Sequence, residues 1–176
     1  RLLSRGLGDV YKRQNMMGRI AAIDASNKDY RKVLIASASG GVFKSDNAGV
    51  TWESIFDKYG AGSIGSVKFD QNDLNTIWVG TGESANRNSS AWGDGIYKST
   101  DGGKTFSNMG LKSTHQIAEI EIHPNNSNIV YAAAVGHLWG YSGERGLFRT
   151  LDGGNSWEKV LGCLLYTSPS PRDRSL

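Results

Sequence analysis

The stretch Gly95-Ile96-Tyr97-Lys98-Ser99-Thr100-Asp101-Gly102-Gly103-Lys104-Thr105-Phe106 decides the fold of this chain. It predicts a short strand, a tight Asp-Gly-Gly turn and the beginning of a second strand. Aspartate suits such a turn because its carboxylate accepts hydrogen bonds from free backbone N–H groups, and the two glycines tolerate positive φ. The aromatic residue at the end gives the returning strand a large side chain to bury.

The same pattern occurs twice more, at 41–52 and at 146–157, and the copy at 41–52 carries an asparagine where the others carry aspartate. The aromatic residues that end the three copies stand 54 and 51 residues apart. A fixed period near 50 in a β-rich chain is typical of stacked β units. The turn positions to which we assign a structural role are Asn47, Gly49, Trp52, Asp101, Gly103, Phe106, Asp152, Gly154 and Trp157.

Both ends of the chain, 1–14 and 163–176, are predicted to be foreign to the protein. One DNA string can encode 4–14, and its reverse complement, read one base out of phase, encodes 163–172. This relation resembles translated sequencing adapter, so neither end enters the reasoning about the fold. We expect the native segment to be 15–162, open at both ends, with any signal peptide upstream of it.

Setting these ends aside changes the bulk properties of the chain. They carry six of the twenty Lys and Arg residues and two of the seventeen Asp and Glu residues, which leaves fourteen positive and fifteen negative side chains. The basic balance of the whole chain is therefore no argument for a nucleic-acid partner. The only cysteine, Cys163, also lies in an end, and no apolar run is long enough for a membrane span.

The native segment predicts an all-β fold with four strands in each period, the fourth of them at 51–56, 106–109 and 157–161. Alternating apolar and polar residues mark the first strand of each period, as in 64–70 and 117–123. The second strands are rich in small residues, which lets neighbouring sheets approach closely. We expect three four-stranded antiparallel blades, at about 18–56, 64–109 and 117–161, that form part of a larger β-propeller. Three blades alone leave a blade face open at each end, which predicts marginal stability or aggregation.

The three turns resemble the Asp-box, or BNR, repeat of sialidases, sortilin-type receptors and family-74 xyloglucanases. The phrases 38–44, 79–83 and 93–98 are similar to those of large bacterial propeller proteins labelled sortilin-like or glycosyl hydrolase. The resemblance covers 18–161 and implies an exported bacterial protein, located outside the cell, in the periplasm or on the cell surface. It also implies that the box is a structural hairpin on the face away from the ligand site, so that Asp101 and Asp152 stabilise turns.

We therefore expect function on the opposite face, where long loops at 83–94 and 136–145 join second to third strands. Aromatic side chains there could stack on sugar rings or anchor a peptide, and charged ones offer polar contacts; packing within the loops and pairing between the charges are the alternative. The candidate ligand-binding residues are Arg87, Trp92, His137, Trp139, Tyr141 and Arg145. His115 and His137 could also act as general acids or bases. Because the native segment has no cysteine and we expect no close pair of histidines, we expect no metal site and no cofactor.

Three hypotheses for function follow. The first is a propeller that binds a glycan or polypeptide through its long loops. The second is a glycoside hydrolase, which needs two carboxylates beside the scissile bond. The weak catalytic candidates for it are Glu83, Asp94 and Glu144, with some acids outside this segment. The third is a non-catalytic assembly scaffold. In each case, the remaining blades of the same chain are expected partners.

Overall fold

The computed structural model describes residues 19–85, 90–137 and 143–162. In these ranges the chain is all-β apart from a single three-residue 3₁₀ helix, η1 (Lys112–Thr114). The twelve strands form three four-stranded antiparallel sheets, each taken in chain order. The predicted fold class and strand order are therefore confirmed.

Each sheet is one blade. Blade 1 contains β1 (Ile20–Ala25), β2 (Val33–Ser37), β3 (Gly41–Ser45) and β4 (Glu53–Ser54). Blade 2 contains β5 (Ile64–Phe69), β6 (Ile77–Thr81), β7 (Ile96–Ser99) and β8 (Ser107–Asn108). Blade 3 contains β9 (Ile117–Ile122), β10 (Val130–Ala134), β11 (Gly146–Thr150) and β12 (Glu158–Gly162).

The outer strands β4 and β8 are shorter than the sequence predicts. Each has two residues, where 51–56 and 106–109 were expected to be extended throughout. Both strands start late because the first residues of the expected ranges bond elsewhere: Thr51 N–H donates to Asn47 Oδ1 in the turn at 2.9 Å, and Phe106 N–H donates to the Tyr59 hydroxyl at 2.8 Å. Pairing to the third strand begins only after the aromatic residue, as in the partners Lys98 and Ser107.

The box turns are locked by hydrogen bonds that each turn makes within itself. In blade 2, Asp101 Oδ1 accepts from the N–H groups of Lys104 and Thr105, both at 2.9 Å. Asp101 Oδ2 accepts from the Thr105 hydroxyl at 2.6 Å, and the Ser99 hydroxyl accepts from Gly103 N–H at 2.9 Å. Because Lys98 to Phe106 can satisfy these groups alone, the turn forms wherever this sequence occurs.

Blade 1 shows how asparagine replaces aspartate in this turn. Asn47 Oδ1 still accepts from the N–H of Thr51, at 2.9 Å. Its Nδ2 donates to the Thr51 hydroxyl at 2.7 Å, whereas Asp152 in blade 3 accepts from the equivalent Ser156 hydroxyl at 2.6 Å. The hydroxyl reverses its role, so the same turn closes without a negative charge.

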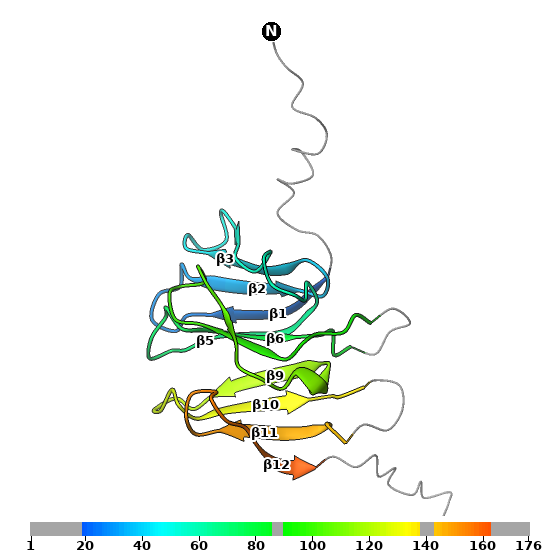
Figure 1. The fold of residues 1–176 in the computed structure, drawn as a ribbon. Helices are drawn as coiled ribbons and strands as arrows, with labels where there is room; N and C mark the ends of the chain where they lie inside the picture. Colours follow the sequence, from blue (N-terminus) through cyan, green and yellow to red (C-terminus); the bar gives the residue numbers. More distant parts are fainter. Residues whose placement is uncertain (1–18, 86–89, 138–142, 163–176) are drawn as a thin grey trace, which may run out of the picture.

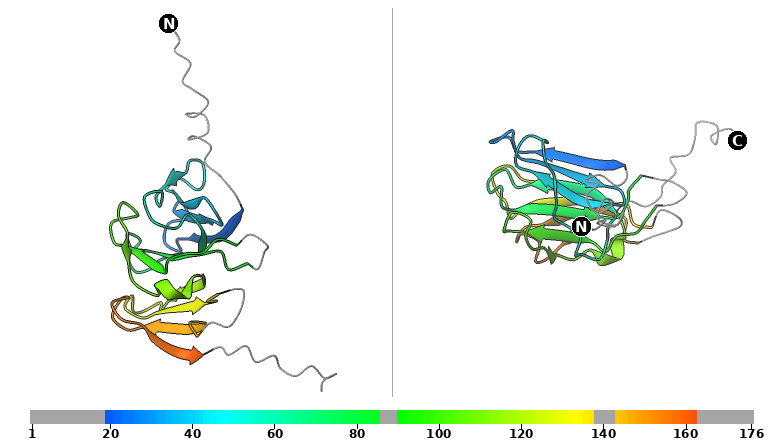
Figure 2. Two further views of the ribbon diagram at one scale, coloured as in Figure 1. Left: turned by 45° about the vertical axis from the view of Figure 1, so that its right-hand side comes forward. Right: turned by 90° about the horizontal axis from the view of Figure 1, so that it is seen from above.

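The blades are stacked face to face (Figures 1 and 2). Two hydrophobic cores fill the two interfaces: one around Phe56, Val67 and Tyr97 between blades 1 and 2, the other around Trp78 and Ile120 between blades 2 and 3. Small residues permit close contact, since a Cβ at Gly80 would lie 2.6 Å from Ile117 Cγ2. The cores therefore join blades and do not lie within one sheet.

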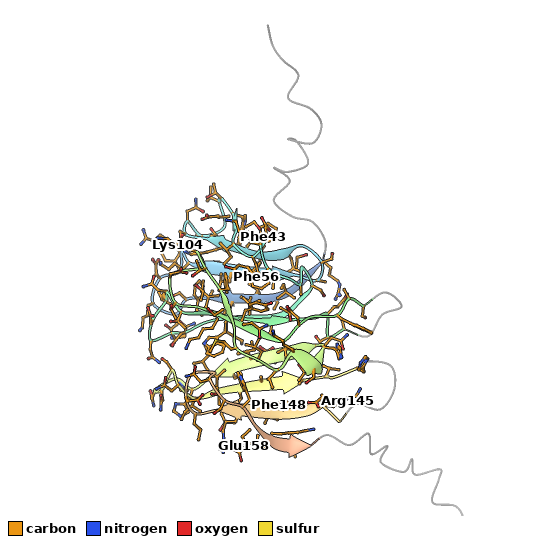
Figure 3. All side chains as sticks on the ribbon, viewed as in Figure 1. Phe43, Phe56, Lys104, Arg145, Phe148 and Glu158 are labelled. Atoms are coloured by element: carbon orange, nitrogen blue, oxygen red, sulfur yellow. The ribbon has the colours of Figure 1, made fainter. Side chains whose placement is uncertain are left out.

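The stack of blades has two opposite sides at the ends of the strands, and each side is defined here by the segments that it carries. The turn face carries the three box turns and the β1–β2, β5–β6 and β9–β10 turns, and the two kinds are bonded together, as by Gly102 N–H to Asn75 O at 2.9 Å. The loop face carries 38–40, 82–85, 90–95, 135–137 and 143–145 with the blade connections 55–63 and 109–116. In Figure 3, Lys104 marks the turn face and Arg145 the loop face, on opposite sides of the molecule. Within the described ranges there is no helix with the length and apolar character that crossing a bilayer requires.

Candidate ligand-binding face

Trp92 is the large aromatic side chain that the described part of the loop face presents to solvent, at 60% exposure. The backbone on both sides of it is held in place. Ala91 O accepts from Glu83 N–H at 3.1 Å, and Gly93 N–H donates to His115 O at 2.7 Å. An exposed indole on a backbone fixed from two directions is a pre-organised contact surface, because little rotamer and chain freedom remains to be lost on binding.

Two histidines lie beside this indole. The ring centroids of His115 and His137 are 4.1 Å apart, and each lies 5.1 Å from the ring of Trp92. His115 comes from the connection between blades 2 and 3, whereas His137 comes from the loop after β10. The expectation that no histidine pair is close was wrong in space, because blade stacking joins residues that are distant in the chain.

Burial and a neighbouring imidazole favour the uncharged form of His115. Burial lowers the pKa of His115, and the neighbouring His137 lowers it further, because a second positive charge at this distance is repelled. No hydrogen bond between described residues uses a ring nitrogen of either histidine. A neutral imidazole has one N–H donor and one nitrogen acceptor, which suits pairing with a hydroxyl or an amide.

His115 has a strained backbone, with φ of +58°. Side chains rarely adopt this region, and such strain persists where the surroundings enforce it. Here Gly93 N–H holds the His115 carbonyl, and Gly82 leaves it room, since a Cβ on Gly82 would lie 2.1 Å from that oxygen. The glycine at 82 is therefore required for His115 to reach the cluster.

Arg145 donates hydrogen bonds from its guanidinium to the backbone that follows β10. Its Nε donates to Val135 O at 2.6 Å, and its Nη2 donates to His137 O at 2.7 Å. The guanidinium thus holds the backbone carbonyl groups of Val135 and His137.

The three candidate carboxylates occupy different environments. Glu83 is buried, at 5% exposure, and forms an ion pair with Arg19 of blade 1. Asp94 Oδ2 accepts a hydrogen bond from the Tyr97 hydroxyl at 2.5 Å. Glu144 is exposed near the start of β11. The contact between Glu83 and Arg19 crosses from blade 2 to blade 1, and no local sequence signal indicates it.

The other candidates of the loop face, Arg87, Trp139 and Tyr141, lie outside the described residues. In the described ranges no group of three or more His, Cys, Asp or Glu side chains is arranged to hold a metal ion. The box carboxylates Asp101 and Asp152 lie on the turn face, each bonded within its own turn.

Comparison with known proteins supports the fold. No family model and no curated protein matches the chain. Among solved structures, an ancestral GH74 enzyme is similar with 25% identity and a TM-score of 0.66, over 82% of this chain and 18% of that one. The GH74 xyloglucanase from Xanthomonas campestris is similar with 18% identity and a TM-score of 0.58, over 81% and 21%.

YCF48 from Cyanidioschyzon merolae is similar with 18% identity and a TM-score of 0.57, over 84% of this chain and 41% of that one. YCF48 bound to D1 peptide is similar at 18% identity and a TM-score of 0.55. The GH74 enzymes and YCF48 are both β-propellers, so the three sheets are propeller blades. The chain spans less than half the length of each of these structures.

Proposed function

We propose that this chain is part of a longer, exported Asp-box propeller that binds a glycan through its loop face. One observation carries the proposal: Trp92 is 60% exposed, held on a fixed backbone, and flanked by the histidine pair at 5.1 Å. An indole face stacks on the C–H face of a sugar ring, and the ring nitrogens of the two histidines exchange hydrogen bonds with its hydroxyl groups. The likeness to a GH74 enzyme at 25% identity favours a glycan over a polypeptide.

Glycan binding is tested with the complete reading frame, by a glycan array followed by calorimetry on the best ligand. Trp92→Ala should weaken binding about fivefold or more, if a sugar ring gains as much from the indole as a nucleic-acid base gains from an aromatic side chain, roughly 1–3 kcal/mol. Tyr30→Ala is the matched control, because Tyr30 is 79% exposed but lies in the β1–β2 turn on the turn face. Equal losses for both variants, or binding to peptides and to no glycan, would contradict the proposal.

The remaining candidate residues of the two long loops are proposed to take part in the same glycan binding. Arg87, Trp139 and Tyr141 are proposed to extend the surface around Trp92, while Arg145 acts through the backbone of His137. Trp139→Ala should weaken glycan binding without changing the thermal stability. Arg145→Ala should reduce both binding and stability, because it frees two carbonyl groups that the guanidinium now satisfies.

A glycoside hydrolase is the second candidate, and the GH74 likeness is the observation that favours it. Glu83, Asp94 and Glu144 are the carboxylates that this part of the chain offers. Glu83 is buried and forms an ion pair with Arg19 of blade 1. Hydrolysis of a polysaccharide by the complete protein, lost in Glu83→Gln or Glu144→Gln with binding retained, would establish this activity.

A further inference from the structure

A pocket opens on the turn face between blades 2 and 3, and we call it the Lys98 pocket. Its volume is about 260 Å³, and its lining includes Lys98, Thr100, Ser107, Asn128 and Gly153. An equivalent pocket, the Lys44 pocket, lies between blades 1 and 2, with Lys44, Asp46, Glu53 and Gly102 in its lining. Among the described residues, none from blade 3 lines the Lys44 pocket, so two neighbouring blades suffice to form a pocket of this kind.

The lysines of the two pockets are held in the same way. Lys44 Nζ donates to Gly102 O at 3.2 Å, and Lys98 Nζ donates to Gly153 O at 3.0 Å. Each lysine thus reaches from the third strand of one blade to the first box glycine of the next. The Lys98 ammonium also lies 4.9 Å from the ring centroid of Trp78. Its position in the pocket is therefore set before a ligand binds, which lowers the entropy lost on binding.

Carboxylates accompany the third-strand cation in blades 1 and 3. Lys44 Nζ lies 3.2 Å from Asp46 Oδ2, and Glu53 is its partner on the neighbouring strand. In blade 3, Arg149 Nη2 donates to Glu158 at 2.8 Å, and these two residues are also partners in register. Each of these cations is thus neutralised within its own blade.

Blade 2 has hydroxyl groups at both of these acidic positions. Thr100 occupies the place of Asp46, directly before the box acid, and Ser107 is the cross-strand partner of Lys98. Among the described residues, no carboxylate forms an ion pair with Lys98. Burial lowers the pKa of Lys98, although the charge of Asp70 raises it in part. Lys98 is therefore a half-buried cation without an anion in contact.

Other polar groups of the Lys98 pocket are also available to a ligand. The Thr100 and Ser107 hydroxyls and the Asn128 carboxamide form no hydrogen bond to another described residue. The lining includes one carboxylate, that of Asp152, but its oxygens accept from the Thr150 and Ser156 hydroxyls of its own turn, at 2.7 and 2.6 Å. The pocket thus offers one cation together with neutral donors and acceptors.

We propose that the Lys98 pocket binds a small hydroxycarboxylate, whose carboxylate accepts hydrogen bonds from the Lys98 ammonium. The hydroxyl groups of this ligand bond Thr100, Ser107 and Asn128. The ligand carboxylate supplies the negative charge that the chain itself supplies in the Lys44 pocket, and charge-assisted hydrogen bonds are stronger than neutral ones. The volume lies just below the roughly 300–1,000 Å³ of sites for drug-sized ligands, which suits a ligand of a few carbons.

Gluconate is the probe, and sorbitol, which has CH2OH in place of the carboxylate, is its uncharged counterpart. Saturation-transfer NMR at constant ionic strength measures both on the protein made from the complete reading frame. Gluconate should bind about tenfold or more tightly than sorbitol, because only gluconate carries an anion for Lys98.

Two substitutions remove the charge that the ligand needs. Thr100→Asp places in blade 2 the acid that the same position carries in blade 1, so the turn tolerates it while the new carboxylate occupies Lys98. Lys98→Met removes the ammonium and keeps an unbranched side chain over Trp78. Each should weaken gluconate binding about tenfold or more.

Lys44→Met is the matched control, because it makes the same change at a lysine that Asp46 already neutralises. Thermal melts of every variant check that it is folded. Loss of gluconate binding in Thr100→Asp and Lys98→Met, with binding retained in Lys44→Met, supports the site. Equal binding of sorbitol and gluconate, no gluconate binding up to about 50 mM, unchanged binding in Thr100→Asp, or equal loss in Lys44→Met overturns it. Thr100 lies on the turn face, so these outcomes are separate from those of Trp92→Ala on the loop face.

Discussion

Replacing the second box glycine of blade 3 measures how tightly its turn packs on blade 2. Gly154 has φ of +103°, and an added Cβ would lie 2.8 Å from Trp78 Cη2 and 3.1 Å from Met109 Cε. Placing a Cβ at positive φ costs about 1–2 kcal/mol. Overpacking a filled interface costs about 1–3 kcal/mol more. Gly154→Ala should therefore lower the free energy of unfolding by about 2–5 kcal/mol.

Two further glycines separate these two costs. Gly49 has φ of +86°, but its added Cβ would approach only Trp52 Cζ2, at 3.4 Å, so Gly49→Ala should cost about 1–2 kcal/mol from backbone strain alone. Among the described residues, nothing lies within 4 Å of a Cβ added at Gly143, so Gly143→Ala should change stability by less than about 0.5 kcal/mol.

The assay is urea unfolding followed by tryptophan fluorescence, at protein concentrations where sedimentation shows a monomer. Thermal melts give a second reading, because each kcal/mol should shift Tm by about 2–4 °C in a domain of this size. If Gly154→Ala is no more destabilising than Gly49→Ala, the third box turn does not pack on the second blade as the structure shows. A large loss of stability in Gly143→Ala would refute the use of contacts made by an added Cβ to predict the cost of a glycine substitution.

Three other outcomes are expected. Trp78 is fully buried between blades 2 and 3, so Trp78→Ala should lower the free energy of unfolding by about 3–5 kcal/mol. Trp78→Phe should lower it far less, because the indole N–H has no hydrogen-bond partner in the described residues. Urea unfolding of both variants tests this. Tyr97→Phe should cost about 1.5–3 kcal/mol in the same assay by removing the 2.5 Å hydrogen bond to the Asp94 carboxylate. The pKa values of Asp101 and Asp152 lie well below their usual 3.8, because the hydroxyl and then the N–H group of the residue four positions on donate to each carboxylate. A lowered folded-state pKa stabilises the fold above the unfolded pKa and less so as pH falls below it, so melts should lose stability between about pH 5 and pH 2, and Asp101→Asn should reduce that loss.

The blades could be predicted from sequence because each box turn is satisfied by its own residues. Asp101 bonds groups three and four positions ahead, so its hydrogen bonds depend on no distant partner. The turn therefore recurs at each copy of the sequence motif, and the strands on either side of each turn could be predicted from it. The length of the outer strands was missed, in part because the same local bonds that identify the turn also take residues such as Thr51 away from the sheet.

The candidate site depended on tertiary structure for the opposite reason. Trp92, His115 and His137 come from three segments that meet only when blade 3 stacks on blade 2, and Glu83 reaches Arg19 only across blades 1 and 2. Contacts of this kind leave no period in the sequence. The sequence by itself determined the repeat, the all-β class, and which segments lie on the turn face and which on the loop face. Stacking decided which loop side chains meet, because the distance between two blades is set by buried side chains and not by chain neighbours.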